Sequence, residues 1–228
     1  GRTVLSVLQR ARFAQQGAFF YATCGFTIVC LVMGGSTGPG FLSDTIVQLL
    51  AVPLLLAGLW RYSSLAPAKQ PRWALAFSLM IAAIPAVQLL PLPPFVWTSL
   101  PGREPLAASL ALLDGDLPWA PISVSPRATW LSLVSLLPPI AVFLATVLLN
   151  YRHRRWLSLV FLAVGGVSVF LGLTQIAQGP TSPLRFFSYT NPTEAVGFFA
   201  NRNHFAALLY IMTLFTAAWA SDLAMAAA

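Results

Sequence analysis

Six apolar runs recur along the chain, and turn-rich or charged segments separate them. An α-helix needs about 20 mainly apolar residues to cross the hydrocarbon core of a bilayer, and the runs are close to this length. The pattern predicts an all-α, polytopic membrane protein. The predicted spans lie near residues 17–33, 45–60, 73–90, 128–149, 156–177 and 205–220.

Two longer segments, residues 91–127 and 178–203, are rich in proline and turn residues and are predicted as loops. Within the first, residues 104–113 are predicted to form a short interfacial helix. Ser125 and Pro126 suit an N-cap followed by the first position of the fourth span. Pro138 and Pro139 are predicted to kink that span, because proline removes a helical hydrogen bond.

Composition supports the membrane assignment, since 57% of the residues are hydrophobic and only 8% are charged. Soluble domains carry about 25% charged residues. All 13 lysines and arginines and all six acidic residues fall outside the predicted spans. Charges near the bilayer centre are costly, so this distribution is typical of transmembrane helices. The seven tryptophans lie near predicted span ends or in loops, as in the aromatic belts of membrane proteins.

The basic residues alternate between successive loops. Nine of the 13 lie in the N-terminal segment, the 61–72 loop and the 150–155 loop. The positive-inside rule then places the N-terminus in the cytoplasm and the 91–127 and 178–203 loops outside. The net charge of +7 is explained by these loops and by anionic lipid, so no nucleic-acid partner is predicted.

The two cysteines, Cys24 and Cys30, lie six residues apart in the first span and point in different directions. They predict neither a disulfide nor a zinc site, and no metal is expected. The chain begins at Gly1 and ends at Ala228, directly after an apolar run. We expect a single transmembrane domain over residues 1–228 that forms the N-terminal half of a longer chain.

The densest group of candidate functional residues is Asn201, Arg202, Asn203 and His204, where the sixth span begins. A helix N-terminus carries free backbone N–H groups and a partial positive charge. With a neighbouring arginine, it favours a phosphate-type anion. A purely structural interpretation is equally open: an asparagine caps the helix, while Arg202 and His204 extend into lipid headgroups.

Two further residues are candidates for contact with the same ligand. Arg127 lies at the outer start of the fourth span, and two arginines at neighbouring helix ends would suit a pyrophosphate group. Simple interfacial anchoring is its alternative role. Gln175 lies near the outer end of the fifth span, where an interhelical hydrogen bond is the alternative. Arg185 is another outer-loop cation, whereas His153 lies in the basic 150–155 loop and is expected to be solvated.

Residues 197–206 (Gly-Phe-Phe-Ala-Asn-Arg-Asn-His-Phe-Ala) resemble the Asn-Arg-Asn-His-Phe-Ala signature of the O-antigen ligase and exopolysaccharide polymerase family of bacterial envelope proteins. Weaker similarities follow the same order along the chain, in residues 91–94, 121–130 and 171–175. The resemblance covers roughly residues 75–215.

This resemblance implies a multi-pass enzyme of the bacterial inner membrane with the C-type glycosyltransferase architecture. Such an enzyme transfers or polymerises glycan from an undecaprenyl-pyrophosphate carrier onto a glycan or lipid acceptor at the outer face. It implies no cofactor, neither metal nor nucleotide sugar. The catalytic residues are expected beyond residue 228, so this portion alone is expected to be inactive, with Arg202 and His204 as wall or headgroup contacts.

Two other classes remain alternatives. A transporter would show internal repeats and charged residues inside its spans, and neither pattern is evident here. A membrane scaffold in a polysaccharide export complex would tolerate replacement of its outer-loop charges. The sequence does not distinguish a ligase from a polymerase, nor does it identify the sugar.

Overall fold

The computed structural model describes residues 2–35, 42–112, 115–187 and 190–227, with the backbone alone for residues 2–15. Residues 36–41 of the predicted turn between the first two spans, and parts of the two long loops at 113–114 and 188–189, lie outside the described residues. The chain forms two compact units. Unit 1 contains residues 1–71 and 138–228, and unit 2 contains residues 72–137.

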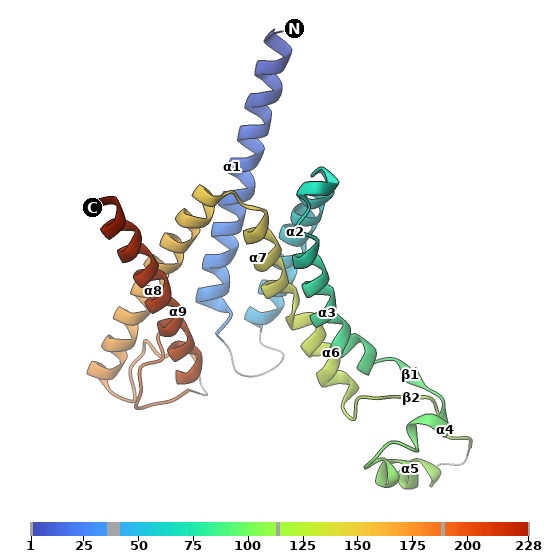
Figure 1. Ribbon diagram of the computed structural model, residues 1–228. Helices are drawn as coiled ribbons and strands as arrows, with labels where there is room; N and C mark the ends of the chain where they lie inside the picture. The colour runs from blue at the N-terminus through green and yellow to red at the C-terminus, as the bar shows by residue number, and fades with distance from the viewer. Residues whose placement is uncertain (1, 36–41, 113–114, 188–189, 228) are drawn as a thin grey trace. The chain divides into compact units, whose positions relative to one another are not determined.

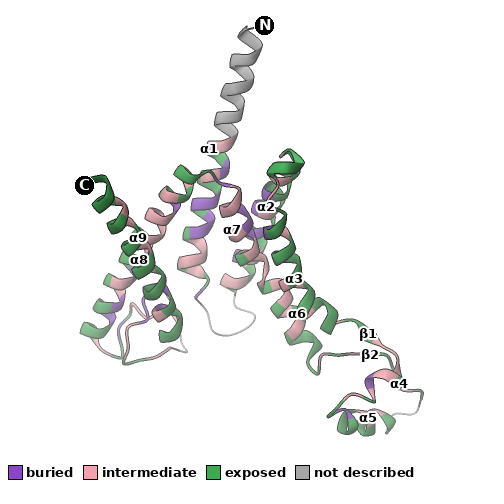
Figure 2. Ribbon diagram, viewed as in Figure 1, coloured by how far each residue is buried: buried purple, intermediate pink, exposed green. Residues whose placement is uncertain are grey.

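The protein is an all-α multi-pass membrane protein, as the apolar runs predict. Among the described residues, five helical stretches are long and apolar enough to cross a membrane: Gln16–Met33, Leu42–Ser63, Pro126–Leu148, Tyr151–Gln178 and Arg202–Ala227. Large apolar side chains such as Leu56, Phe170 and Leu214 are exposed on these helices. Figure 2 shows exposed residues along each of the long helices. A lipid environment accounts for that exposure, because lipid tails solvate apolar side chains.

The third predicted span, residues 73–90, is shorter than expected. It forms helix α3 (Arg72–Gln88), whose 17 residues give a length of about 26 Å. This is slightly less than the roughly 30 Å of hydrocarbon in a typical bilayer. Backbone turns end the helix at Leu89 and Leu90, ahead of Pro91. The prediction of a membrane span is therefore confirmed for five of the six runs, and for α3 it stays a prediction.

Unit 1 is built from five helices, which Figure 1 traces: α1 (Arg2–Met33), α2 (Leu42–Ser63), α7 (Leu137–Leu148), α8 (Tyr151–Gln178) and α9 (Arg202–Ala227), with a short 3₁₀ turn, η1 (Pro67–Lys69). Helix α1 packs against α2 and α8, and α8 packs against α9. Helix α9 extends seven residues beyond the predicted end of the sixth span at residue 220.

Arg61 and the basic residues of the 150–155 loop lie at one end of the packed helices of unit 1, which we call the basic end. The Arg61 guanidinium lies 5.2 Å from the centre of the Phe19 ring, and the His153 ring stacks on Phe20 at 4.4 Å. His153 is thus half-buried rather than fully solvated as predicted. Arg155 forms an ion pair with Asp222 at 3.4 Å. The contacts with Phe19 and Phe20 bring the 61–72 and 150–155 loops to the same level of α1, near the predicted start of the first span, as the charge pattern predicts.

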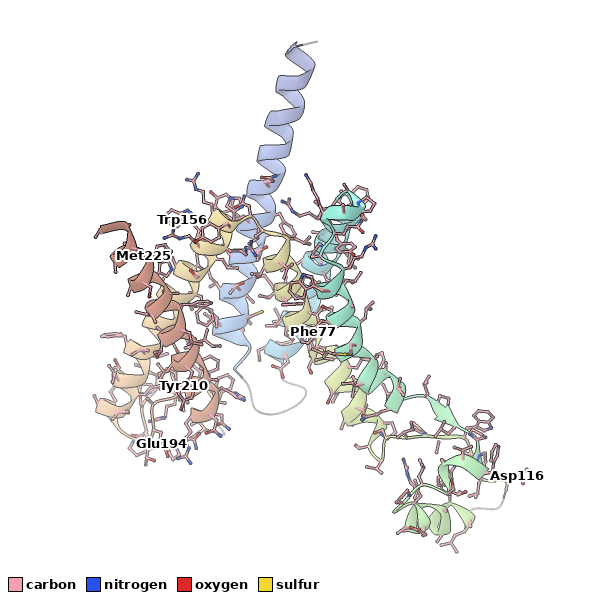
Figure 3. The ribbon with its side chains drawn as sticks, viewed as in Figure 1. Phe77, Asp116, Trp156, Glu194, Tyr210 and Met225 are labelled. Carbon is pink, nitrogen blue, oxygen red and sulfur yellow. The ribbon has the colours of Figure 1, made fainter. Side chains whose placement is uncertain are left out.

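The opposite end of unit 1, the loop end, carries the α8–α9 loop (residues 179–201). The Ala200 N–H donates to the Gly35 carbonyl at 2.8 Å, which ties this loop to the end of α1. Figure 3 shows Glu194 of the loop beside the end of α8 and the start of α9, with Trp156 and Met225 at the other end of this helix pair. The alternation of more basic and less basic loops therefore corresponds to two separate ends of unit 1.

Unit 2 contains α3, β1 (Pro91–Leu92), α4 (Pro94–Trp97), α5 (Glu104–Ala111), β2 (Ala120–Pro121) and α6 (Pro126–Ser135). Helices α3 and α6 pack together, and β1 pairs with β2 in antiparallel register. The Trp97 side chain is fully buried, and its indole N–H donates to the Pro118 carbonyl at 2.9 Å. Arg103 is also buried, and its Nη2 donates to the carbonyls of Pro121 and Ile122. The predicted 91–127 loop is thus a folded substructure, and helix α5 confirms the short helix.

The fourth predicted span is interrupted at one residue near the predicted kink, and Leu136 there keeps helical backbone angles (φ −76°, ψ −16°). Helix α6 ends at Ser135 and α7 begins at Leu137, so Leu136 lies at the break. Pro138 and Pro139 lack N–H groups, and their rings clash with the carbonyls four residues earlier, Val134 and Ser135. The predicted start is confirmed with Ser125 as N-cap and Pro126 first in the helix, although the Ser125 side chain makes no capping bond. The break coincides with the boundary between the two units. That residues 1–228 form a single transmembrane domain stays a prediction.

The two ends of unit 1 give a direct test of orientation. We expect the basic end to face the cytoplasm, because positively charged loops are retained there. In a background with Cys24 and Cys30 replaced by alanine, an impermeant maleimide should label Thr181→Cys in intact cells. It should label Ser64→Cys only after permeabilisation. The reverse labelling pattern would contradict the predicted topology.

Candidate functional site

The α8–α9 loop is held in place by the side chain of Gln175, which is completely buried near the end of α8. Its Nε2 donates to the carbonyls of Leu184 and Gly197, each at 2.9 Å. Its Oε1 accepts from the N–H groups of Val196 and Gly197, at 3.1 and 3.0 Å. We call these four bonds the Gln175 clamp.

The clamp changes the interpretation of Gln175 as a ligand contact. A glutamine amide has two donor hydrogens and two acceptor lone pairs, and all four are used. No polar atom of Gln175 is left for a substrate in this arrangement. The alternative of an interhelical bond is also wrong, because the partners are main-chain groups of the loop rather than another helix.

Small residues on the same face of α8 allow the loop to approach closely. Gly165, Ser168, Gly172 and Gln175 recur at spacings of three and four, so they share one face of the helix. A side chain at Gly172 would lie 3.1 Å from the Ala195 Cβ. Ser168 Oγ accepts from the Phe198 N–H at 3.2 Å. This face therefore positions residues 195–198 directly before the Asn201–His204 segment.

Gly197 is needed at the centre of this contact for two reasons. Its φ angle is +58°, in the left-handed region that residues with side chains rarely adopt. A Cβ there would also lie 2.2 Å from Ser168 Oγ and 2.8 Å from the Ser168 carbonyl oxygen. Any side chain at position 197 would push the loop away from α8.

The N-terminus of α9 is capped by the protein itself. The Arg202 N–H donates to Asn191 Oδ1 at 2.9 Å, and the Asn203 N–H donates to Asn201 Oδ1 at 2.8 Å. The His204 N–H donates to the Asn201 carbonyl at 3.1 Å. The expected free N–H groups for an anion are therefore occupied, and the capping alternative is confirmed for Asn201. An anion at this position would have to be bound by side chains.

The exposed polar side chains at this helix start are Arg202, Asn203 and His204. The His204 ring lies edge-on to Phe199, with centroids 6.4 Å apart. Arg202 Nη1 pairs with Glu194 Oε1, and both side chains are partly exposed. A hydrogen bond from the Thr193 hydroxyl, together with the Arg202 charge, lowers the pKa of Glu194 below its ordinary value. Glu194 therefore stays ionised and available to Arg202.

The sequence identified Arg185 only as one of several outer cations, but the structure gives it a distinctive setting. Its Nη1 donates to the carbonyls of Asn191 and Glu194, at 2.7 and 3.0 Å. Among the described residues, its buried Nε and Nη2 have no hydrogen-bond partner, and the buried Thr190 hydroxyl has none either. No sequence signal distinguishes Arg185 from the other arginines, because its partners are backbone carbonyls.

Arg127 is exposed in helix α6 of unit 2, whereas Arg202 belongs to unit 1. The proposed convergence of the two arginines on one ligand therefore stays a prediction. Within the described ranges, no cluster of three histidine, cysteine, aspartate or glutamate side chains is arranged to hold a metal ion.

Comparison with models of protein families, with curated proteins and with solved structures finds no match. The fold and its composition define the class of an all-α, multi-pass membrane protein. The site adds two features to this class. The loop between two long helices is fixed by buried side chains, and the cation of Arg202 and the imidazole of His204 are exposed.

We expect Gln175→Leu to release the α8–α9 loop, since it leaves two N–H and two C=O groups without their partner. A buried unsatisfied group costs on the order of 1–3 kcal/mol. Hydrogen exchange at Val196 and Gly197 should accelerate markedly, and the protein should unfold at a lower temperature. The matched control is Gln88→Leu, where the side chain is exposed. Equal effects of the two substitutions would show that the clamp is not important for stability.

Proposed function

We propose that this chain belongs to a bacterial inner-membrane glycosyltransferase of the O-antigen ligase or exopolysaccharide polymerase kind. It would act at the outer face on an undecaprenyl-pyrophosphate-linked glycan, for envelope or exopolysaccharide synthesis. The observation that carries the proposal is the fixed backbone of residues 195–201. It leads directly into the Asn201–His204 segment, which carries the family resemblance, while the side chains of Arg202 and His204 are exposed.

The reaction transfers a sugar between two oxygen atoms. An acceptor hydroxyl loses its proton to a base and attacks the anomeric carbon of the donor. The bond from that carbon to the pyrophosphate oxygen breaks, and undecaprenyl pyrophosphate leaves with the bonding electrons. Inversion at the anomeric carbon completes the transfer.

Arg202 is the residue of this segment best suited to the negative charge of the pyrophosphate. A guanidinium remains protonated, and two of its parallel N–H groups can bind two phosphate oxygens. Its pair with Glu194 is no obstacle to this role. The pair is exposed, and exposed ion pairs contribute little to stability because solvent screens them. A doubly charged ligand would therefore displace Glu194 or share the guanidinium with it.

In the full-length protein, Arg202→Ala should lower glycan transfer by about tenfold or more, because it removes a cation that stabilises the leaving group. Arg152→Ala is the matched control, since it removes an exposed cation at the basic end. Transfer is measured as product per molecule of protein in the membrane. Unchanged transfer by Arg202→Ala would remove Arg202 from the site, whereas absence of transfer by the wild-type protein would favour a non-catalytic transporter or export scaffold.

A further inference from the structure

Arg185 is a half-buried cation, and only the Nη1 nitrogen of its guanidinium makes hydrogen bonds to described residues. The two bonds from its Nη1 to the carbonyls of Asn191 and Glu194 fix the guanidinium within the α8–α9 loop. The other edge, Nε and Nη2, is shielded from solvent and makes no hydrogen bond. Buried donors are nearly always paired, so this edge requires an explanation.

The charge of Arg185 also lacks a described counter-ion. The ion pairs found within the described ranges join Arg155 to Asp222 and Arg202 to Glu194, and neither includes Arg185. Glu194 contacts Arg185 only through its main-chain carbonyl, because its carboxylate pairs with Arg202. A buried charge without a partner is costly, so an acceptor that carries negative charge would stabilise this arrangement more than a neutral one.

The free edge has the geometry that arginine uses to bind oxyanions. Nε and Nη2 carry two parallel N–H groups that match two oxygens of one phosphate or carboxylate. A third unpaired donor, the buried Thr190 hydroxyl, lies on the same loop. Thr190 directly precedes Asn191, whose carbonyl accepts from Arg185. Three donors suit a phosphate group, which has more oxygens than a carboxylate.

We propose that Arg185 Nε and Nη2, together with Thr190 Oγ1, form a binding site for a phosphate group within the α8–α9 loop. This site uses other donors than the neighbouring Arg202, which contacts the same two residues, Asn191 and Glu194. It requires no glycan chemistry. The phosphate could come from a lipid headgroup or from free inorganic phosphate. Because the ligand would pair donors that have no partner within the loop, binding should further slow the hydrogen exchange of residues 179–201.

The test uses the full-length protein in micelles of a maltoside detergent, which contains no phosphate, in a phosphate-free buffer. One arm adds inorganic phosphate, and the other adds phosphatidic acid to the micelles. Hydrogen exchange of residues 179–201 and the thermal unfolding midpoint are measured in both arms. Protection by inorganic phosphate identifies a free anion as the ligand, whereas protection by phosphatidic acid alone identifies a lipid headgroup.

Arg185→Lys keeps the charge but loses the bidentate edge, so apparent affinity should fall by about tenfold or more. Thr190→Val should weaken binding by a smaller factor. Because it leaves the two bonds from Arg185 Nη1 intact, it still tests the site if Arg185→Lys fails to fold. Arg152→Lys is the matched control, because Arg152 is an exposed cation at the basic end, outside this loop, and it should retain binding. Absence of protection in the wild-type protein, or equal protection in the wild type and Thr190→Val, would overturn the proposal. Glycan transfer plays no part in this readout, so the outcome is independent of the proposed enzyme activity.

Discussion

The arrangement at the loop end of unit 1 depends on one buried amide. Gln175 makes four hydrogen bonds to main-chain groups of Leu184, Val196 and Gly197, all far from it in sequence. Without this side chain, the four main-chain groups would lie among apolar helices, where neither water nor other protein groups would pair with them. The small side chains of α8 and the absence of a side chain at Gly197 make the approach possible. The candidate site is thus positioned by backbone contacts rather than by its own charged groups.

The two ends of unit 1 use different chemistry. At the basic end, long side chains pair across helices: Arg155 contacts both Asp222 and the Trp219 ring, whose N–H donates to Ser158. Such contacts tolerate small displacements, because the side chains are long and partly exposed. At the loop end, amides and hydroxyls bind the backbone at short range. This end therefore has a more closely defined backbone, which a binding site requires.

Sequence patterns predicted most of the fold, because the physical constraints on membrane helices are simple. Length and apolar content located five spans, and Pro138 and Pro139 marked the break between α6 and α7. The length of α3 was overestimated, because Leu89 and Leu90 are apolar but form turns. Hydropathy records the preference for lipid and does not show where a backbone leaves the helical conformation.

The candidate site was predicted less completely. The segment Asn201–His204 was recognised from its residue types, and the capping role of Asn201 followed from helix chemistry. The role of Gln175 was not predictable, because its four partners are main-chain groups with no residue-specific signal. The same holds for Arg185, which is held by two carbonyls. One sequence shows which side chains can bond, whereas the fold decides which backbone groups they meet.

The Gln175 clamp and the Asn201 cap contain no titratable group. The backbone of the loop should therefore be the same in acidic, neutral and saline media. The exposed Arg202–Glu194 pair differs in this respect. Salt screens it, and its contribution is lost as the pH falls through the lowered pKa of Glu194. A change in pH or salt would therefore alter the charge of this surface but not the backbone that shapes it. Gln175 and Asn201 keep the loop folded in acid, whereas Arg202 and Glu194 determine which charged ligands the surface attracts.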